Sequence, residues 1–201
     1  MNLFPPYKRL PMKYAAIDFE TAYWGPGNAC SLGIVISDGE KITQQWYHLI
    51  RPLSMNFDPG CMRVNGISPE DVAEENKFPA FWKDIAELLE DTIVFAHNAR
   101  FDMGVLASAL DAYGLPDLHF LYGDTVALSR KLWKDMPNHK LNTVAEALGF
   151  DFQHHQALDD ARACEYIVRK ALEETDSPTV EELMRLTGQK LKPFTVKRNN
   201  H

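Results

Sequence analysis

The spacing of apolar and polar residues changes along the chain and divides it into two halves. In the first half the apolar runs are short and rich in β-branched residues, which is typical of strands. One strand begins at Tyr14, and two more are expected over 31–37 and 41–50. Asp38-Gly39 joins the last two, and Asp-Gly between β-rich runs is a strong hairpin signal. The pattern therefore predicts an antiparallel meander of three strands.

From Ala80 onward, apolar residues recur at helical spacing, and these helical segments alternate with short apolar runs. Strands separated by helices imply parallel additions to a sheet. Two such strands are expected, over 92–96 and 118–121. Helices are expected over 80–90, 101–113, 124–134, 141–148 and 157–173. The sequence thus predicts an α/β fold in which helices flank a mixed five-stranded sheet, with three antiparallel strands and two parallel ones.

The remaining segments lack a clear period. Residues 1–12 contain three prolines and are expected to form an irregular lead, and residues 23–29 form a turn-rich loop. The long stretch 52–79 is a loop that is either functional or disordered, with room for a short helix from Pro69.

Near the end of the chain, Ser177-Pro178 with Glu182 predicts a capped helix that runs to Leu186, and a basic tail follows it. We divide the chain into an N-terminal lead (1–12), one domain (13–175), and a C-terminal helix with a basic tail (176–201).

Composition excludes several classes of protein. No apolar run approaches the roughly 20 residues that span a bilayer, and the N-terminus lacks the order of a signal peptide. The three cysteines are widely spaced and form no Cys-x-x-Cys pair, which argues against disulfides and a zinc knuckle. We expect a soluble cytoplasmic protein with no membrane partner.

The formal charge of −7 is unevenly distributed. Residues 1–13 and 190–201 carry seven of the 21 basic residues and no acidic ones, which leaves 14 basic and 28 acidic residues between them, a net charge of −14. A polyanion could approach an acidic cleft there only with bound cations. The two basic ends are either arms that touch phosphate or solvated tails.

Two carboxylates interrupt the first strand where it should be most apolar. Asp18 and Glu20 are two residues apart, so on a strand they lie on the same face. Like charges at this distance resist ionising together unless a cation lies between them. The alternative is that the strand ends at Ile17 and both acids lie in a solvated loop.

Two further acids fall on apolar helix faces. At about 100° per residue, Asp102 lies near the middle of the apolar face of its helix, and Asp160 lies on that of the last long helix, whereas Asp111 and Asp159 point away. A buried carboxylate costs several kcal/mol unless it is paired or binds a metal ion. A helix cap or a salt bridge would explain either acid alone, but not four acids on one side of the sheet.

Four carboxylates without a histidine–cysteine cage suit Mg²⁺ or Mn²⁺. A pair of such ions forms the clamp for in-line attack at phosphorus, in which one ion activates water and the other stabilises the leaving oxygen. His155 precedes Asp160 by five residues and could take a proton from the water. His154 competes for this role, and spacing alone does not separate the two.

Three motifs resemble those of the DEDDh exonucleases, the family of the DNA polymerase III epsilon subunit, ribonuclease T and oligoribonuclease. They are Asp18-Phe-Glu20, His97-Asn-Ala-Arg-Phe-Asp102 and His155-Gln-Ala-Leu-Asp-Asp160, in this order within roughly residues 13–173. The resemblance implies a ribonuclease H-like fold, two Mg²⁺ or Mn²⁺ ions held by the four acids, and His155 as the general base.

The resemblance also implies a substrate, which is a nucleic acid with a free 3′ end. We expect single-stranded DNA to be favoured, release of nucleoside 5′-monophosphates, and a polymerase or repair partner. An RNA-directed 3′ exoribonuclease of the same fold and a non-catalytic polymerase-docking module are the alternatives. The residues expected to contact substrate are Phe19, Thr21, Asn65, Gly66, Ile67 and Asn98.

Overall fold

The structure is a computed structural model that describes residues 12–198. The expected irregular lead, with Lys8 and Arg9, therefore lies outside the described residues apart from Met12, and so do residues 199–201.

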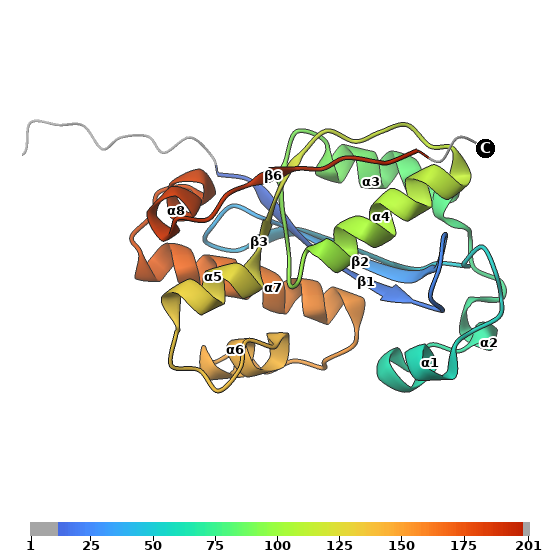
Figure 1. Cartoon of the computed structure of the whole chain (residues 1–201), viewed down its shortest axis with the longest axis horizontal. Coiled ribbons are helices and arrows are strands. Elements are labelled where there is room, and N and C mark those ends of the chain that lie inside the picture. Colours follow the sequence, from blue (N-terminus) through green and yellow to red (C-terminus); the bar gives the residue numbers. More distant parts are fainter. Residues whose placement is uncertain (1–11, 199–201) are drawn as a thin grey trace, which may run out of the picture.

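The predicted meander is present as strands β1 (Tyr14–Thr21), β2 (Ala29–Ser37) and β3 (Ile42–Leu49), each antiparallel to the next (Figure 1). Strands β4 (Ile93–Ala96) and β5 (Leu121–Asp124) add to β1 in parallel, as expected. The predicted fold class is confirmed.

Two details of the sheet differ from the prediction. The fifth strand begins three residues later than expected, because Leu118 and Phe120 pack into the core from the connection that precedes it. A sixth strand, β6 (Lys192–Pro193), lies antiparallel to β5 and completes the order β3-β2-β1-β4-β5-β6. Two residues that include a proline carry no periodicity, so the sequence pattern does not predict this strand.

The long helices match the helical pattern. Their bounds are α3 (Trp82–Leu89), α4 (Arg100–Tyr113), α5 (Thr125–Leu132), α6 (Leu141–Ala147), α7 (Ala157–Glu174) and α8 (Val180–Thr187). A 3₁₀ turn over Phe78–Phe81 leads into α3. Helix α8 begins after Thr179, whose side chain accepts a hydrogen bond from the Glu182 N–H, so the cap is Thr179 and not Ser177.

The stretch 52–79 is more ordered than its sequence pattern indicates. It contains α1 (Pro59–Asn65) as well as the expected short helix α2 (Pro69–Val72). Asp58 caps α1 at its start and Gly66, with φ of 72°, ends it. A helix of seven residues is too short to show a period, and only these caps mark it in the sequence.

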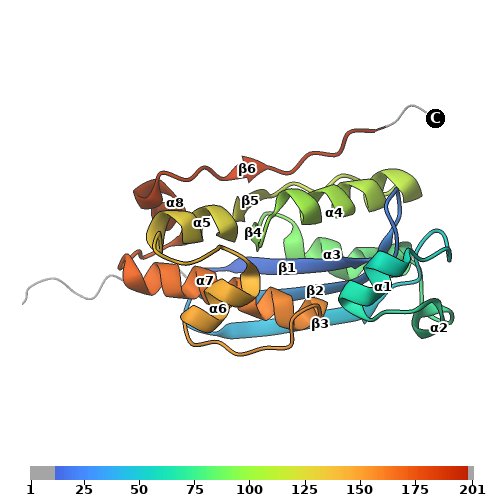
Figure 2. The same cartoon turned by 60° about the horizontal axis from the view of Figure 1, so that its bottom comes forward.

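Helices cover both faces of the sheet (Figure 2). Helix α7 packs across β1 and β2 on one face, together with α5 and α8, while α3 and α4 cover the other. Alternate residues of β1 therefore enter different cores: Ala15, Ile17 and Phe19 face α3 and α4, and Tyr14 and Ala16 face α7. By this alternation the side chains of the next even-numbered residues of β1 also point toward α7.

The last described residues are fixed to the domain. Phe194 stacks on Phe120 with the two rings 4.6 Å apart, and the Arg198 guanidinium donates to the Leu110 carbonyl oxygen at 3.0 Å and pairs with Asp117. Arg198 is therefore bound to the protein itself, whereas the sequence allowed either a phosphate-binding arm or a solvated tail.

Gly33 sets the distance between α7 and the sheet. It lies opposite Asp18 in the β1–β2 ladder, and a Cβ atom at this position would lie 2.3 Å from the Ala157 carbonyl oxygen and 2.6 Å from the Leu158 Cα. We expect Gly33→Ala to destabilise the fold by about 3 kcal/mol, since the clash is with backbone that can only move as part of α7. Thermal unfolding measures this loss.

Gly104→Ala is the matched control for this prediction. Gly104 lies inside α4, and nothing lies within 4 Å of a Cβ atom there. This change should stabilise the protein by up to ~1 kcal/mol, because alanine is the better helix former. Equal melting temperatures for the two variants would contradict the assigned role of Gly33.

Candidate active site

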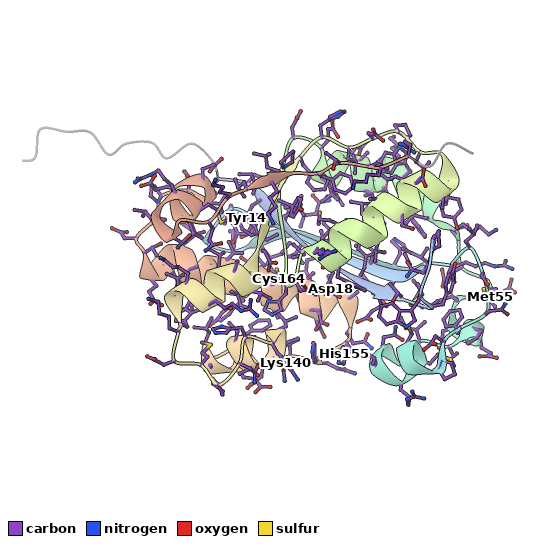
Figure 3. All side chains as sticks on the ribbon, in the orientation of Figure 1. Tyr14, Asp18, Met55, Lys140, His155 and Cys164 are labelled. Atoms are coloured by element: carbon purple, nitrogen blue, oxygen red, sulfur yellow. The ribbon has the colours of Figure 1, made fainter. Side chains whose placement is uncertain are left out.

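Three of the predicted acids converge at the end of β1. Asp18 and Glu20 lie within the strand, so the alternative that it ends at Ile17 is wrong. Asp160 lies in the first turn of α7, and oxygen atoms of the three carboxylates lie within 4.8 Å of one another. Figure 3 shows Asp18 at the centre of the molecule, between the ribbons of β1 and α7.

Asp102 lies beside this group, in the first turn of α4. Its side chain is 1% exposed, and its Oδ1 accepts a hydrogen bond of 3.0 Å from the Phe19 N–H. The hydrogen bond ties Asp102 to the strand between Asp18 and Glu20. All four predicted acids are thus brought together, and Asp159 and Asp111 lie outside the group, as the helical wheel indicated.

Burial and mutual repulsion make this site unfavourable for negative charge. Burial raises the pKa of Asp18 well above its ordinary value, and the charges of Asp102, Asp160 and Glu20 raise it further. Burial, then Asp160, raises the pKa of Glu20 to about 7. Burial also raises the pKa of Asp102, against the hydrogen bond from Phe19.

Glu165 shows how the same protein stabilises a buried acid without a metal ion. Its Oε1 accepts hydrogen bonds from the Tyr14 hydroxyl, the Ser37 hydroxyl and the Arg169 guanidinium, while its Oε2 has no hydrogen-bond partner. Among the described residues, no hydrogen-bond donor or cation serves the Asp18 carboxylate in this way. An all-oxygen group of acids with raised pKa values fits a hard divalent cation such as Mg²⁺ or Mn²⁺.

The pKa of Glu20 gives a pH dependence that can be measured without metal. A folded-state pKa raised from 4.5 to about 7 means that folding favours the protonated acid, so stability is lost as the pH rises from 4.5 to about 7. The difference corresponds to about 3 kcal/mol. In EDTA we expect the melting temperature to fall by roughly 6 to 12 °C across this range.

Glu20→Gln is the control, and its melting temperature should fall less over the same range. Added Mg²⁺ should raise the melting temperature of the unmodified protein most near pH 7 and above, where the acids would otherwise repel one another. An identical pH profile for the variant and the unmodified protein would contradict the buried position of Glu20.

The two adjacent histidines take different positions around Asp160. The His154 Nδ1 lies 3.0 Å from the Asp160 Oδ1, and this contact raises the pKa of His154. The His155 backbone N–H donates to Asp160 Oδ2 at 3.1 Å, and the two imidazole rings stack 3.8 Å apart. Burial and the neighbouring His154 lower the pKa of His155, which favours its neutral form.

The backbone of His155 is unusual, with φ of 69°. Residues other than glycine adopt this left-handed conformation at an energetic cost, and active sites are among the places where they do so. Asp91, Asn98 and Asp176 also have positive φ. A neutral, half-buried ring held beside Asp160 is the better proton acceptor of the two. Both rings lie near Asp160, and the opposite directions of their pKa shifts are a difference that spacing did not indicate.

A cleft of about 920 Å³ opens over the acids. Of the residues predicted to contact substrate, Phe19, Thr21, Asn65 and Asn98 line it. Gly66 and Ile67 are not among the residues that line the cleft; Ile67 packs into a small core with Ala22, Cys30 and Val72.

Asn65 holds the end of β1 in place. Its side-chain amide donates to the Thr21 carbonyl oxygen at 3.1 Å, and its Oδ1 accepts from the Ile67 N–H at 2.9 Å. The amide group thus connects the end of α1 to the strand that carries Asp18 and Glu20.

The cleft contains further residues that the sequence pattern did not identify. Trp24 is 80% exposed and Val64 is 54% exposed, and both line the cleft. The Asp124 carboxylate lines the cleft and caps α5 by accepting from the Val126 N–H. A strand followed directly by Asp-Thr is a cap signal that could have located Asp124, whereas exposure of Trp24 has no signature in the sequence.

None of the helices formed by residues 12–198 combines the length and apolar character that crossing a bilayer requires.

Residues 15–168 match the family model of the RNase T exonucleases, whose description is "Exonuclease". The chain is 29% identical over 191 residues to the PolC-type DNA polymerase III of Thermotoga maritima. This alignment covers 90% of this chain and 14% of the polymerase. The chain is 30% identical over 192 residues to the 3′-5′ exonuclease DinG of Bacillus subtilis, covering 91% of this chain and 20% of DinG. The chain therefore spans a small part of these relatives.

Two solved structures show the same fold. Exonuclease X in complex with 5′ overhanging duplex DNA superposes with a TM-score of 0.68 and 24% identity, over 87% of this chain and 99% of the other. The nuclease domain of 3′hExo, a DEDDh family member bound to rAMP, gives a TM-score of 0.71 and 17% identity, over 91% and 97% of the two chains. With the family model matched along most of its length, and the motifs of that family gathered in one cleft, the chain belongs to the RNase T exonuclease family.

Proposed function

We propose that this protein is a metal-dependent 3′-to-5′ exonuclease that hydrolyses the terminal phosphodiester of a nucleic acid and releases nucleoside 5′-monophosphates. The observation that carries the proposal is the group of carboxylate oxygens of Asp18, Glu20 and Asp160 within 4.8 Å of one another in an open cleft. The name of the relative DinG, a 3′-5′ exonuclease, supports the direction of degradation.

The four acids would hold two Mg²⁺ or Mn²⁺ ions, which supply Lewis-acid stabilisation of charge on the attacking and leaving oxygens. Asp18, Glu20 and Asp160 offer the converging oxygens. Asp102 lies behind Asp18, fixed by the Phe19 N–H. The group is rigid because each acid lies on β1 or in the first turn of a helix packed on the sheet.

His155 takes the proton from the attacking water in this proposal. Its neutral ring can accept a proton, and its backbone N–H holds it beside Asp160. Phe19, Thr21 and Asn98 line the cleft next to the acids, and in this proposal they contact the terminal nucleotide. Gly66 and Ile67 would act only through the position of α1.

For the substrate we propose single-stranded DNA ends, in a proofreading or repair role alongside a polymerase in the cytoplasm. The PolC-type polymerases among the relatives support this choice. The three unpaired cysteines fit a reducing compartment. RNA is the second candidate, because the similar 3′hExo domain binds rAMP in its structure.

The test is digestion of 5′-labelled single-stranded DNA, duplex DNA and RNA of one sequence with Mg²⁺ or Mn²⁺, and with EDTA as control. We expect a ladder that shortens from the 3′ end, 5′-monophosphate as product, and the fastest loss on single-stranded DNA. Faster loss of RNA would replace the DNA assignment. Binding without any shortening would support the non-catalytic docking module instead.

A further inference from the structure

The two walls of the active-site cleft differ in charge. Among the lining residues within 12–198, Arg130 and Lys140 are the only lysine or arginine residues, and both lie on the side formed by the end of α5 and the start of α6. Asn138 and His139 lie with them, and we call these four residues the cationic wall. Figure 3 shows Lys140 at the start of α6; His155 lines the same cleft.

The opposite wall has a different character. It is formed by α1 and the loop after β1, and it presents Trp24, Val64 and Cys61 together with Asp58. A strand whose scissile phosphate lies at the acids therefore meets a mainly apolar surface with Asp58 on one side, and Arg130 and Lys140 on the other, where Asp124 caps the start of α5.

The cations of the wall are available to a ligand. Arg130 and Lys140 are exposed, and neither forms an ion pair with any residue in the described part of the chain. Other arginines of this acidic protein do pair with acids: Arg162 with Asp159, and Arg185 with Glu182. Two unpaired cations facing one cleft suit an anion with charge at two points, such as successive phosphates.

His97 fixes the wall to the domain. Its Nε2 lies 2.9 Å from the His139 carbonyl oxygen, which can only accept, so Nε2 carries the hydrogen. Its Nδ1 then accepts from the Thr125 hydroxyl at 2.9 Å. One ring thereby joins the end of β4, the start of α5 and the segment before α6.

A second contact orients the His139 ring. The buried Ser129 hydroxyl donates to the Val126 carbonyl oxygen at 3.0 Å and lies 3.0 Å from the His139 Nδ1, which serves as donor. The segment before α6 is thus held at its backbone by His97 and at a side chain by Ser129.

We propose that the cationic wall binds the internucleotide phosphates of the strand upstream of the scissile bond, and that His97 is the positioning residue that holds this wall. The proposal rests on the proposed exonuclease function and adds the course of the strand: the terminal nucleoside lies toward α1, and the preceding nucleotides pass along α5 and α6. Contacts to phosphate carry no base or sugar information, so the wall should serve DNA and RNA alike.

The test compares the hydrolysis of two substrates by the full-length protein in the presence of Mg²⁺. A 5′-labelled oligodeoxythymidylate has phosphates upstream of the scissile bond, and the p-nitrophenyl ester of thymidine 5′-monophosphate has none. We expect Arg130→Ala and Lys140→Ala each to lower the ratio of kcat/KM for the oligonucleotide to that for the ester by about tenfold, the value of a charge-assisted hydrogen bond. The same reduction should be found with oligouridylate.

Salt dependence gives an independent readout. Each lost phosphate contact should reduce the slope of log kcat/KM for the oligonucleotide against log salt concentration by ~0.7. Lys131→Ala is the matched control, since Lys131 is the exposed neighbour of Arg130 on α5 but is not among the residues that line the cleft. Its ratio and slope should match those of the unmodified protein.

The role of His97 is tested in combination. His97→Ala should lower the ratio of kcat/KM for the oligonucleotide to that for the ester as far as the Arg130→Ala/Lys140→Ala double variant does. Adding His97→Ala to that double variant should lower the ratio no further, because all three residues act through the cationic wall. His97→Gln should restore part of the ratio, as an amide can both accept from Thr125 and donate to the His139 carbonyl oxygen.

Three results would overturn the inference. The first is a ratio of kcat/KM for the oligonucleotide to that for the ester that stays within twofold of the unmodified protein in both Arg130→Ala and Lys140→Ala, and the second is an equal reduction of this ratio in Lys131→Ala. The third is a fully additive loss when His97→Ala is introduced into the Arg130→Ala/Lys140→Ala double variant. If the unmodified protein hydrolyses neither substrate, the proposed function itself fails.

Discussion

Asp18→Asn is expected to lower the rate of 3′ end hydrolysis by about 100-fold or more, while the metal-free protein becomes more stable. The loss follows because metal catalysis supplies several kcal/mol, and about 3 kcal/mol of barrier corresponds to two orders of magnitude in rate. The gain follows because the charge removed is one that burial, Asp102, Asp160 and Glu20 all oppose.

The opposite signs of these two effects distinguish a metal-binding acid from a structural one. An acid that held the fold together through donors, as Glu165 does, would lose stability on the same change. For Asp18→Asn we expect the melting temperature in EDTA to rise by at least ~3 °C, and added Mg²⁺ to raise it less than in the unmodified protein.

The measurements are single-turnover hydrolysis of a labelled oligonucleotide and thermal unfolding with and without Mg²⁺. Asp159→Asn is the matched control, because Asp159 is next to Asp160 on α7 but pairs with Arg162 outside the cleft. It should leave the rate within about twofold of the unmodified value. An Asp18→Asn enzyme that keeps more than about a tenth of its rate would contradict the assignment.

His155→Asn is expected to lower kcat by about 100-fold or more, because the general base is lost. Asparagine is the appropriate replacement, since it tolerates the left-handed backbone that His155 adopts at φ of 69°. His154→Asn should lower kcat by less than about tenfold. The His154 ring contacts Asp160, and this contact raises the pKa of His154, which makes the ring a poorer proton acceptor at a given pH.

The pH profile of kcat separates the two histidines further. The base must be neutral, and burial lowers the pKa of His155, so activity should be lost only as the pH falls below about 6.5. This acidic limb should disappear in His155→Asn and persist in His154→Asn. Reversed effects of the two variants would assign the base to His154.

Much of this protein follows from local patterns. Alternation marks the strands around Asp18, helical spacing marks α4 and α7, and both periods are set by backbone geometry that needs no tertiary context. From the sequence alone, the same geometry places Asp102 and Asp160 on the buried faces of their helices. A carboxylate on an apolar face is a conflict within the sequence itself, and such conflicts indicate functional sites.

Elements without a period were missed for a physical reason. Helix α1 is defined by its caps at Asp58 and Gly66, and β6 exists only because β5 offers it an edge. The start of β5 was misplaced since Leu118 and Phe120 are as apolar as strand residues but fill a gap beside α3 and α4.

The sequence by itself determined the fold class, the four acids and the family resemblance, because periodicity and motif order are properties of neighbouring residues. Only the tertiary structure decided that burial lowers the pKa of His155, that Ile67 belongs to a core, and that Arg130 and Lys140 share one wall of the cleft. These depend on distances between residues far apart in the chain, and burial and charge act through those distances and not through sequence separation.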